Sequence, residues 1–550
     1  MTSRLPVAVL AYAAIAAALV MAVHAATLHD GFNYDDYHII RPHSRAEVAA
    51  TFRGTWDATG IEVKFFRPLT VVLNALRFHV CGLNSEAHHA TTLAMFWLAA
   101  WLFGLLARSF LGSESGGALA VAAFVVHPSM PYSAVAWITN QMHVLQLLVV
   151  LSALLWWCAV RRRGLVWWTP LLAFQAAAFM VKEDGVMLVP VILALHWLRR
   201  AIAERDLPHP PWPFIAIAAA IGGGLLYYRD QALHGLGGYG RPSADQAWSN
   251  YRRGFESVFR LVPARRPWQK EASWFVTIVP VLALACWRRC SPNVRFTLLA
   301  GIAIGALFNL PFIFVVKAQQ MHLVGMGAAL LITAGVVGLA QAVPSRAPRA
   351  AVLAAACAAV MAMALVSRDI TRDFDPFNKI ILAADDIVLG WAAVPLELRE
   401  YLARKKEADA SARLSANPAE AVDLVAFGLH ARETDRSGRP VRWMSAVLTE
   451  LYVHQRFRTI EIPLRHPFEM VRSPVTGVIE IDGRVLDRIT FADGAWRRSS
   501  LTLRPGDVRF WRRMHRVVIR IDRTWAPADV IPGSQDRRTL GLQVGQPSLR

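Results

Sequence analysis

The sequence predicts an all-α polytopic membrane domain, followed by a small extracytoplasmic α+β domain that ends in a β-sandwich. Two features of the whole chain predict this fold class. Of its 550 residues, 55% are hydrophobic and only 18% are charged, whereas soluble domains carry about 25% charged residues. The apolar residues form long runs in the first two thirds of the chain and short alternating runs near its end. A single soluble domain and an intrinsically disordered chain are therefore both excluded.

The long apolar runs predict about eleven transmembrane helices, since a spanning helix needs roughly 20 mostly apolar residues. The first run also resembles a signal peptide, but it is longer than the hydrophobic region of such peptides. We therefore expect it to remain as the first span. The predicted spans are residues 5–28, 88–110, 117–136, 142–160, 166–181, 185–198, 212–229, 273–288, 296–316, 321–342 and 349–367.

The basic residues between these runs predict how the chain crosses the membrane. With a cytoplasmic N-terminus, all the short basic loops fall on the cytoplasmic side, as the positive-inside rule requires. These loops contain Arg161–Arg163, Arg199–Arg205, Arg288–Arg295, and Arg346 with Arg349. The longer basic loop 230–272 falls on the other side and is an exception. We expect a multi-pass protein of a bacterial-type inner (plasma) membrane, with its C-terminal domain extracytoplasmic.

The net charge of +19 first suggests nucleic acid as a partner. Of this excess, +13 lies before Arg368, where arginines stand between apolar runs, and +6 lies from Arg368 onward. No basic stripe is interleaved with aromatic residues in the way that nucleic-acid binding requires. We therefore expect membrane lipid, and no nucleic acid, as a partner.

Three regions follow from these patterns. Residues 1–367 form the membrane domain, in which 29–87 and 230–272 are extracytoplasmic loops. Residues 368–440 form an extracytoplasmic helical connector, and residues 441–550 form a β-rich domain.

Two shorter elements are also predicted. Residues 66–82 are apolar but short and include Arg67 and Arg77, which is typical of a helix that lies in the membrane interface. Residues 385–412 have the apolar spacing of a helix.

Short alternating runs in the last region indicate β-strands, and several strands at this spacing indicate a small β-sandwich. Asp482-Gly483 stands between two of the runs and is a hairpin signal. The predicted strands are 459–462, 478–481, 485–491, 501–503, 517–521 and, as a possible last strand, 540–544.

Two adjacent carboxylates, Asp35 and Asp36, follow the first apolar run. Such a pair could hold a divalent cation such as Mg²⁺ or Mn²⁺ through oxygen ligands, or one Asp could act as a general base. The alternative interpretation is a solvated turn at a membrane face.

A second cluster, Lys182-Glu183-Asp184, lies between two closely spaced apolar runs. Charges at such a place need partners or a water-filled cavity, although Lys182 and Glu183 could simply pair with each other. A third motif, His127-Pro128, could be a plain helix break, because proline cannot continue the hydrogen-bond ladder.

These motifs, taken in order, resemble a known family. The order is Phe32-x-Tyr34-Asp35-Asp36, Phe66-Arg67-Pro68-Leu69, His127-Pro128 leading to Val135-Ala136-Trp137-Ile138, and Lys182-Glu183-x-Gly185 with Pro190. The pattern is similar to that of the polytopic GT-C glycosyltransferases, in the branch related to protein O-mannosyltransferases. The match covers residues 1–200 by motif and 200–370 by hydropathy only.

The resemblance implies an active site on the extracytoplasmic face and a polyprenyl-phosphate-linked sugar as donor. The sugar would be transferred, with inversion, to an envelope glycan, lipid or protein acceptor, and Asp35 or Asp36 would be the general base. The leaving group is a phosphate, so cationic or neutral hydrogen-bond donors matter more than a general acid. The candidates for contacts with the donor or its phosphate are Arg67, Gln141, His143, Lys182, Glu183, Arg229 and His322.

Two other functions remain open at this point. A transporter for lipid-linked glycans would carry charged residues in mid-span and broken helices at matched positions in two halves, whereas this chain gathers its charges at the ends of apolar runs. An enzyme of the O-antigen ligase or polymerase type would depend on arginines and histidines of the outer loops rather than on Asp35 and Asp36. A homologue that has lost catalysis is a further alternative.

Overall fold

The computed structural model folds into two compact units, and each is described by itself. The first unit comprises Met1–Leu28, Ser44–Leu73 and His88–Asp375, and the second comprises His29–His43, Asn74–Ala87 and Pro376–Arg550. The structure describes residues 5–29, 32, 36–56, 65–235, 242–259, 277–314, 321–343, 345–373, 423–430, 432–435, 437–503 and 514–550. The predicted helix at 385–412 lies outside these residues.

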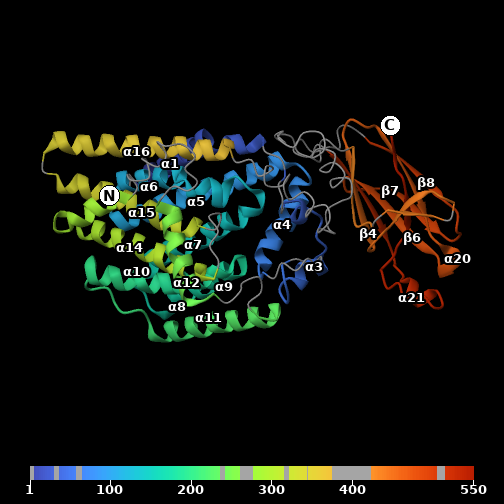
Figure 1. The fold of residues 1–550 in the computed structure, drawn as a ribbon, viewed down its shortest axis with the longest axis horizontal. Coiled ribbons are helices and arrows are strands. Elements are labelled where there is room, and N and C mark those ends of the chain that lie inside the picture. Colours follow the sequence, from blue (N-terminus) through green and yellow to red (C-terminus); the bar gives the residue numbers. More distant parts are fainter. Residues whose placement is uncertain are drawn as a thin grey trace. The chain divides into compact units, whose positions relative to one another are not determined.

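The first unit is helical, and its long helices α1, α14 and α16 run roughly parallel (Figure 1). Short 3-10 segments (η) and one π-helical turn, η2, connect the longer helices. Three of its elements, η1, α4 and α5, lie only partly in this unit. The elements of the first unit are α1 Leu5–His24, η1 Ala25–His29, α3 Arg45–Ala50, α4 Pro68–Cys81, α5 Ser85–Leu111, α6 Glu114–Val126, η2 Pro131–Val135, η3 Ile138–Asn140, α7 Gln141–Val160, α8 Leu165–Trp168, α9 Pro170–Val181, η4 Glu183–Met187, α10 Leu188–Ile202, α11 Trp212–Leu233, α12 Ala244–Phe259, η5 Trp287–Arg289, α14 Pro292–Asn309, η6 Leu310–Ile313, α15 His322–Ala342 and α16 Arg346–Asp373.

Within the described residues, seven helices are long and apolar enough to cross a membrane, which confirms a multi-pass pattern. They are Val7–Leu28, Ser85–Leu111, Ile138–Val160, Glu183–Ile202, Pro292–Ile313, His322–Ala342 and Arg349–Asp369. Eleven spans are not confirmed. Of the other four predicted spans, 166–181 and 117–136 contain only shorter apolar helices, 212–229 falls within α11, and 273–288 lies partly outside the described residues.

The helix predicted at 117–136 ends at Val126 because Pro128 follows. His127 takes extended backbone angles (φ −64°, ψ 124°), as residues before proline do. The carbonyls that the break leaves at the end of α6 receive side-chain donors from other helices. His24 Nε2 donates to Val125 O at 3.0 Å, and Ser367 Oγ donates to Val126 O at 2.6 Å. The proline thus ends α6, and α1 and α16 cap it.

Helices α14 and α15 approach each other closely through glycines. A Cβ atom added to Gly327 would lie 2.7 Å from the carbonyl oxygen of Gly301, so neither position has room for a side chain. Close contact through small residues is the usual way in which membrane helices pack. This packing fixes α15, whose first residue, His322, belongs to the candidate site described below.

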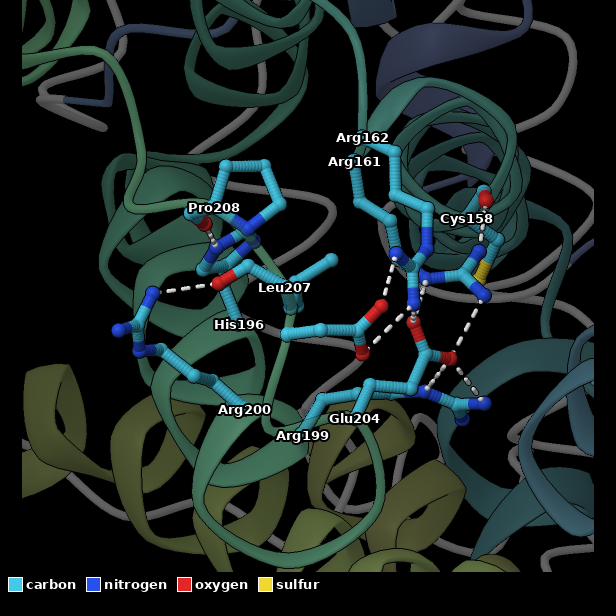
Figure 2. A network of polar contacts seen from close by, with 10 residues as sticks. Cys158, Arg161, Arg162, His196, Arg199, Arg200, Glu204, Leu207 and Pro208 are labelled. Atoms are coloured by element: carbon cyan, nitrogen blue, oxygen red, sulfur yellow. Dashed lines mark hydrogen bonds and ion pairs between the residues drawn. The ribbon is translucent and has the colours of Figure 1, made fainter.

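A cluster of charged side chains joins two loops of the helical unit (Figure 2). Glu204 accepts hydrogen bonds from Arg161 and Arg199, both at 2.8 Å, and from Arg162 at 3.1 Å. Arg162 also pairs with Asp206 at 2.8 Å. The cluster fastens the loop between α7 and α8 to the loop between α10 and α11.

Tryptophans with large exposed fractions stand on the helices next to these loops. Trp167 of α8 and Trp197 of α10 are each 46% exposed, and Trp212 of α11 is 74% exposed. Arg163 lies over the Trp167 ring, 4.4 Å from its centroid. Tryptophan beside arginine is typical of a membrane–water interface, and the assignment of this interface to the cytoplasmic side stays a prediction.

The charge cluster predicts a pH dependence of stability. Burial acts to raise the pKa of Glu204, but hydrogen bonds from Arg161 and Arg199 outweigh it and lower the pKa from 4.5 to about 2. A lowered carboxyl pKa means that the ionised form stabilises the fold above pH 4.5, and this stabilisation is lost as pH falls toward 2. We expect Glu204→Gln to lower the unfolding temperature at pH 7. We also expect the unfolding temperature of this variant to fall less than that of the wild type between pH 4.5 and pH 2. Thermal unfolding in detergent measures both effects, and Asp245→Asn, at an exposed position, is the control. If Glu204→Gln lowered the unfolding temperature equally at pH 7 and pH 2, the pH dependence would not come from Glu204.

The second unit contains a β-sandwich, whose strands β4, β6, β7 and β8 are labelled in Figure 1. One sheet has the strand order β1-β4-β9-β6-β7, and the other has the order β11-β5-β10-β3-β2, with β8 paired to β5. Leu451 and Ile479 of the first sheet share a core with Ile460 and Leu464 of the second. The strands are β1 Leu424–Phe427, β2 Glu433–Thr434, β3 Pro440–Trp443, β4 Leu448–His454, β5 Thr459–Arg465, β6 Val475–Ile481, β7 Arg484–Phe491, β8 Arg497–Thr502, β9 Met514–Ile521, β10 Gln543–Gly545 and β11 Ser548–Leu549.

The predicted hairpin is present and each predicted strand overlaps an observed strand, but the sheets begin earlier than predicted. The predicted last strand, 540–544, overlaps β10 only at Gln543 and Val544, and β11 follows it. Asp482 and Gly483 join β6 to β7 with φ angles of 50° and 89°, as a tight hairpin turn requires. The first strand begins at Leu424, before the predicted domain boundary at residue 441. This strand lacks the alternation of apolar and polar residues by which a strand is recognised in a sequence, because Val425, Ala426 and Phe427 are all buried.

Segments from the first predicted extracytoplasmic loop also belong to this unit. Helix α2 (Asp36–Ile39) and the second half of α4 are part of it. The Phe78 ring of α4 packs edge-on against Phe427 and Tyr452 of the sheet, at centroid distances of 5.9 and 5.7 Å. The helix predicted at 66–82 is therefore present as α4, while its position in a membrane interface stays a prediction.

Candidate active site

The charged turn between α9 and α10 is the centre of the candidate site. Helix α9 ends at Val181, Lys182 takes an extended backbone conformation, and η4 begins at Glu183. The side chains are withdrawn from solvent, with exposed fractions of 3% for Lys182, 12% for Glu183 and 3% for Asp184. Lys182 and Asp184 are thus buried at helix ends and Glu183 is partly buried between them, so that each charge needs partners.

Gly185 makes this turn possible. A Cβ atom there would lie 2.2 Å from the backbone carbonyl carbon of Ala178, so any side chain would push the turn away from α9. We expect Gly185→Ala to destabilise the protein by about 1–3 kcal/mol, the usual effect of overpacking. Thermal unfolding in detergent tests this expectation, and Gly164→Ala, where nothing lies within 4 Å, is the control. Equal unfolding temperatures for the two variants would show that the turn tolerates a side chain.

Glu183 joins two arginines from different helices. Its carboxylate lies 3.4 Å from Arg67 Nε, directly before α4, and 4.0 Å from Arg229 Nε, on the last turns of α11. It also accepts a hydrogen bond from the backbone N–H of Phe66 at 3.3 Å. Both arginine side chains are buried, with exposed fractions of 4% and 9%. One carboxylate therefore holds two guanidinium groups together.

Aromatic rings hold the Arg67 side chain in place. Its guanidinium carbon lies 4.2 Å from the centroid of Phe65 and 5.7 Å from that of Trp56. Arginine stacks on aromatic faces through cation–π attraction and keeps its N–H donors at the edge of its plane. The guanidinium group is thus oriented before any ligand arrives.

Asp184 belongs to a second set of contacts, with Lys182 and Gln146. Lys182 Nζ lies 2.9 Å from Asp184 Oδ2, and 5.0 Å from the centroid of the Phe312 ring. Gln146 of α7 donates from Nε2 to Asp184 Oδ1. The cation and the amide thus share one buried carboxylate.

Gln146 extends this second set to two histidines. Its Oε1 accepts from His322 Nε2 at 2.7 Å. The His322 ring stacks on His143 of α7 with centroids 4.3 Å apart and an interplanar angle of 19°. Helices α7 and α15 therefore meet the charged turn through polar side chains.

The two sets of contacts adjoin each other. Arg67 Nη1 contacts Met142 Sδ at 3.4 Å, next to His143, and Thr70 Oγ1 donates to Val181 O at 3.0 Å. Lys182, Glu183 and Asp184 link the two sets covalently. We call the whole the cationic site: Arg67, His143, Gln146, Lys182, Glu183, Asp184, Arg229 and His322. It has three basic side chains, Arg67, Lys182 and Arg229, and two carboxylates, Glu183 and Asp184.

The structure brings together most of the predicted contact residues. Of the seven, all but Gln141 belong to the cationic site; Gln141 is buried as the first residue of α7. The predicted contact residues did not include Gln146, nor Asp184, which was predicted only as part of the charged cluster between two apolar runs. Gln146 lies three residues after His143 on an otherwise apolar helix, and Asp184 is two residues after Lys182, so a polar stripe was visible in the sequence.

The predicted carboxylate pair is described only in part. Asp36 is the first residue of α2 and is 1% exposed, and its charge interacts with that of the buried Arg77 in α4. Asp35 lies outside the described residues. The described residues contain no group of three or more His, Cys, Asp or Glu that could hold a metal ion, and a cation at Asp35 and Asp36 stays a prediction.

The fold and the site define a multi-pass helical protein with a buried cationic site and a C-terminal β-sandwich. No family model matches the sequence, and no curated protein matches it. Among solved structures, the chain is similar to the single-particle cryo-EM structure of the arabinosyltransferase EmbB from Mycobacterium smegmatis, with 12% sequence identity and a TM-score of 0.35. The match covers 98% of this chain and 64% of that chain. At this level, similarity identifies neither an activity nor a substrate, and the O-mannosyltransferase-related branch stays a prediction.

Proposed function

We propose that the protein is a membrane glycosyltransferase that uses a polyprenyl-phosphate-linked sugar and acts on a glycan, lipid or protein acceptor at the extracytoplasmic face. The observation that carries this proposal is the cationic site, with Arg67, Lys182 and Arg229 buried at helix ends. Breaking the sugar–phosphate bond leaves a polyprenyl phosphate, whose charge increases in the transition state. Preorganised cations in a site that excludes water are the strongest means of stabilising such charge.

The side chains divide this work by their chemistry. Arginine presents several N–H donors in a plane and suits phosphate oxygens, while lysine acts as a point charge. Arg67 and Arg229 are therefore assigned to the phosphate oxygens and Lys182 to the overall charge. Glu183 contacts both arginines and acts through them by fixing their orientation.

The acceptor hydroxyl must lose a proton as it attacks the sugar. A carboxylate is a suitable general base for this step, and the motif assigns it to Asp35 or Asp36. The proton passes from the acceptor oxygen to the carboxylate, the new glycosidic bond forms with inversion, and polyprenyl phosphate leaves.

The placement of charge favours the enzyme over the transporter. Lys182 directly follows α9, Arg67 directly precedes α4 and Arg229 lies near the end of α11. A transporter would place such charges in broken helices at mid-span. The ligase or polymerase alternative would also use arginines and histidines, which this site contains. The two functions differ in their need for Asp35 and Asp36, and the Asp→Asn variants described in the Discussion distinguish them.

Binding of the leaving group tests the donor assignment. Polyprenyl monophosphate is added to the full chain in detergent, with polyprenol of the same length as the control. We expect only the phosphate to raise the unfolding temperature, because ligands that bind the native state stabilise it, and we expect Arg67→Ala to abolish the shift. Equal shifts with both lipids, or no shift with either, would overturn the assignment.

A further inference from the structure

The Lys182 ammonium group has two partners of different kinds. Its Nζ lies 2.9 Å from Asp184 Oδ2 and 5.0 Å from the centroid of the Phe312 ring. Lysine carries its charge on a flexible four-carbon stem, so a single carboxylate restricts it only weakly. An ammonium group over an aromatic ring is also attracted by the face of that ring. Phe312 therefore restricts the position of Lys182 further.

The Phe312 ring is itself fixed, because it belongs to a break at the end of α14. The α-helix ends at Asn309, and η6 follows as a 3-10 turn that contains Pro311. The ring is 5% exposed and packs in one apolar cluster with Val324 and Ala328 of α15. A helix end of this kind leaves backbone carbonyls that need donors from other segments.

Helix α12 supplies these donors. Tyr251 Oη donates to Ala306 O at 3.3 Å, and Asn250 Nδ2 donates to Ile313 O at 2.9 Å. In the opposite direction, Asn309 Nδ2 donates to Tyr251 O at 2.7 Å. These hydrogen bonds join α12 to the end of α14 and to the last residue of η6, so α12 fixes the segment that carries Phe312.

A glycine lets α12 lie this close to the break. A Cβ atom at Gly254 would collide with the side chain of Asn309. Asn250 lies one turn before Gly254 on the same face of α12, whereas Trp248, on the other face, is 67% exposed. The helix belongs to the loop 230–272, which is predicted to be extracytoplasmic, and none of the predicted site residues lies in this loop.

We infer that η6 and α12 are part of the donor site, and that Phe312 is a positioning residue that holds Lys182 for the phosphate of the lipid donor. This inference rests on the proposed function for the identity of the ligand. A side chain that is held in place before the ligand arrives loses less freedom on binding. Lys182, like Arg67, is then held by a carboxylate together with an aromatic ring.

A double-mutant cycle tests the role of the ring. Binding of polyprenyl monophosphate to the full chain in detergent is followed by the thermal shift over a range of lipid concentrations. Phe312→Leu, which stays apolar but has no aromatic face, should weaken binding by roughly 3–30-fold, the range of a cation–π contact. In Lys182→Met, which keeps both arginines of the site, Phe312→Leu should have no further effect. An equal loss in both backgrounds would show a purely structural role and overturn the inference.

The same cycle without ligand separates this inference from the proposed function. Phe312→Leu should lower the unfolding temperature more in the wild type than in Lys182→Met, because only the wild type has the contact to lose. Equal decreases would overturn the contact. If the wild type binds no polyprenyl monophosphate, the proposed function fails and the donor role of Phe312 fails with it, while the ligand-free cycle still decides whether the ring holds Lys182.

Asn250→Ala tests the part played by α12 and also serves if Phe312→Leu does not fold. It removes the donor to Ile313 O, while alanine favours the helix. We expect it to weaken binding of polyprenyl monophosphate in the wild type and to have no further effect in Lys182→Met. Gln246→Ala, at an exposed position of the same helix, is the matched control and should bind as the wild type does. Unchanged binding in Asn250→Ala would remove α12 from the donor site.

Discussion

Replacing Arg67 by alanine should lower the rate of sugar transfer by roughly 10²–10³-fold, the effect of removing one preorganised donor from a developing anion. Arg67 contacts Glu183 and stacks on Phe65, so its N–H donors are fixed before the donor lipid binds. Arg67→Lys should recover part of the rate, since lysine keeps the charge but not the planar set of donors. Initial rates in membranes, with radiolabelled polyprenyl-phosphate sugars at matched protein abundance, measure the effect.

Arg53→Ala is the control for the Arg67 variants, because Arg53 is exposed and lies in the same segment of the first unit. It should keep the wild-type rate. A wild-type rate in Arg67→Ala would remove Arg67 from the donor site. A loss in Arg67→Ala that is matched by a loss of folded protein would be structural, and the thermal shift with polyprenyl monophosphate distinguishes this case.

Asp35→Asn and Asp36→Asn, made separately, should differ greatly in their effect. Asparagine has nearly the same shape but cannot take up a proton, so the variant that lacks the general base should lose roughly 10²–10⁴-fold in rate. The other variant should lose less. Transfer rates and envelope glycan profiles, compared at equal protein abundance, measure the difference.

Exposed Asp529→Asn, in the same unit as Asp36, is the control for the carboxylate variants and should behave as the wild type. Unchanged rates and profiles in both Asp35→Asn and Asp36→Asn would remove the general-base assignment. They would leave the cationic site as a lipid-phosphate site and favour the ligase or polymerase alternative, which does not depend on Asp35 and Asp36.

The sequence alone was sufficient where one local pattern determines the structure. The hairpin at Asp482-Gly483 follows from residues that tolerate positive φ, and both adopt it. Apolar runs of spanning length became helices, such as α5 and α15. The charged residues at the ends of apolar runs, Arg67, Lys182 and Glu183, have charged partners, as burial at such a place requires. Their role in a functional site stays a prediction.

Prediction from sequence was insufficient where two distant segments determine the result. The helix expected to reach residue 136 ends at Val126, where donors from α1 and α16 satisfy the freed carbonyls. The pairing of Lys182 with Asp184, rather than with Glu183, depends on Gln146 and on arginines far away in the chain. Likewise, the contact of His322 with Gln146 joins α15 to α7. A single sequence does not contain these contacts as a local pattern.

Cleavage of a lipid-linked donor is the measurement that tests the account most directly. Membranes containing the full chain are supplied with radiolabelled polyprenyl-phosphate sugars, and both the lipid phase and the acceptor fraction are analysed. The account predicts that polyprenyl phosphate is released and label enters an acceptor, and that both are lost in Arg67→Ala. If none of the donors is cleaved above the level of membranes that lack the protein, the glycosyltransferase proposal is wrong.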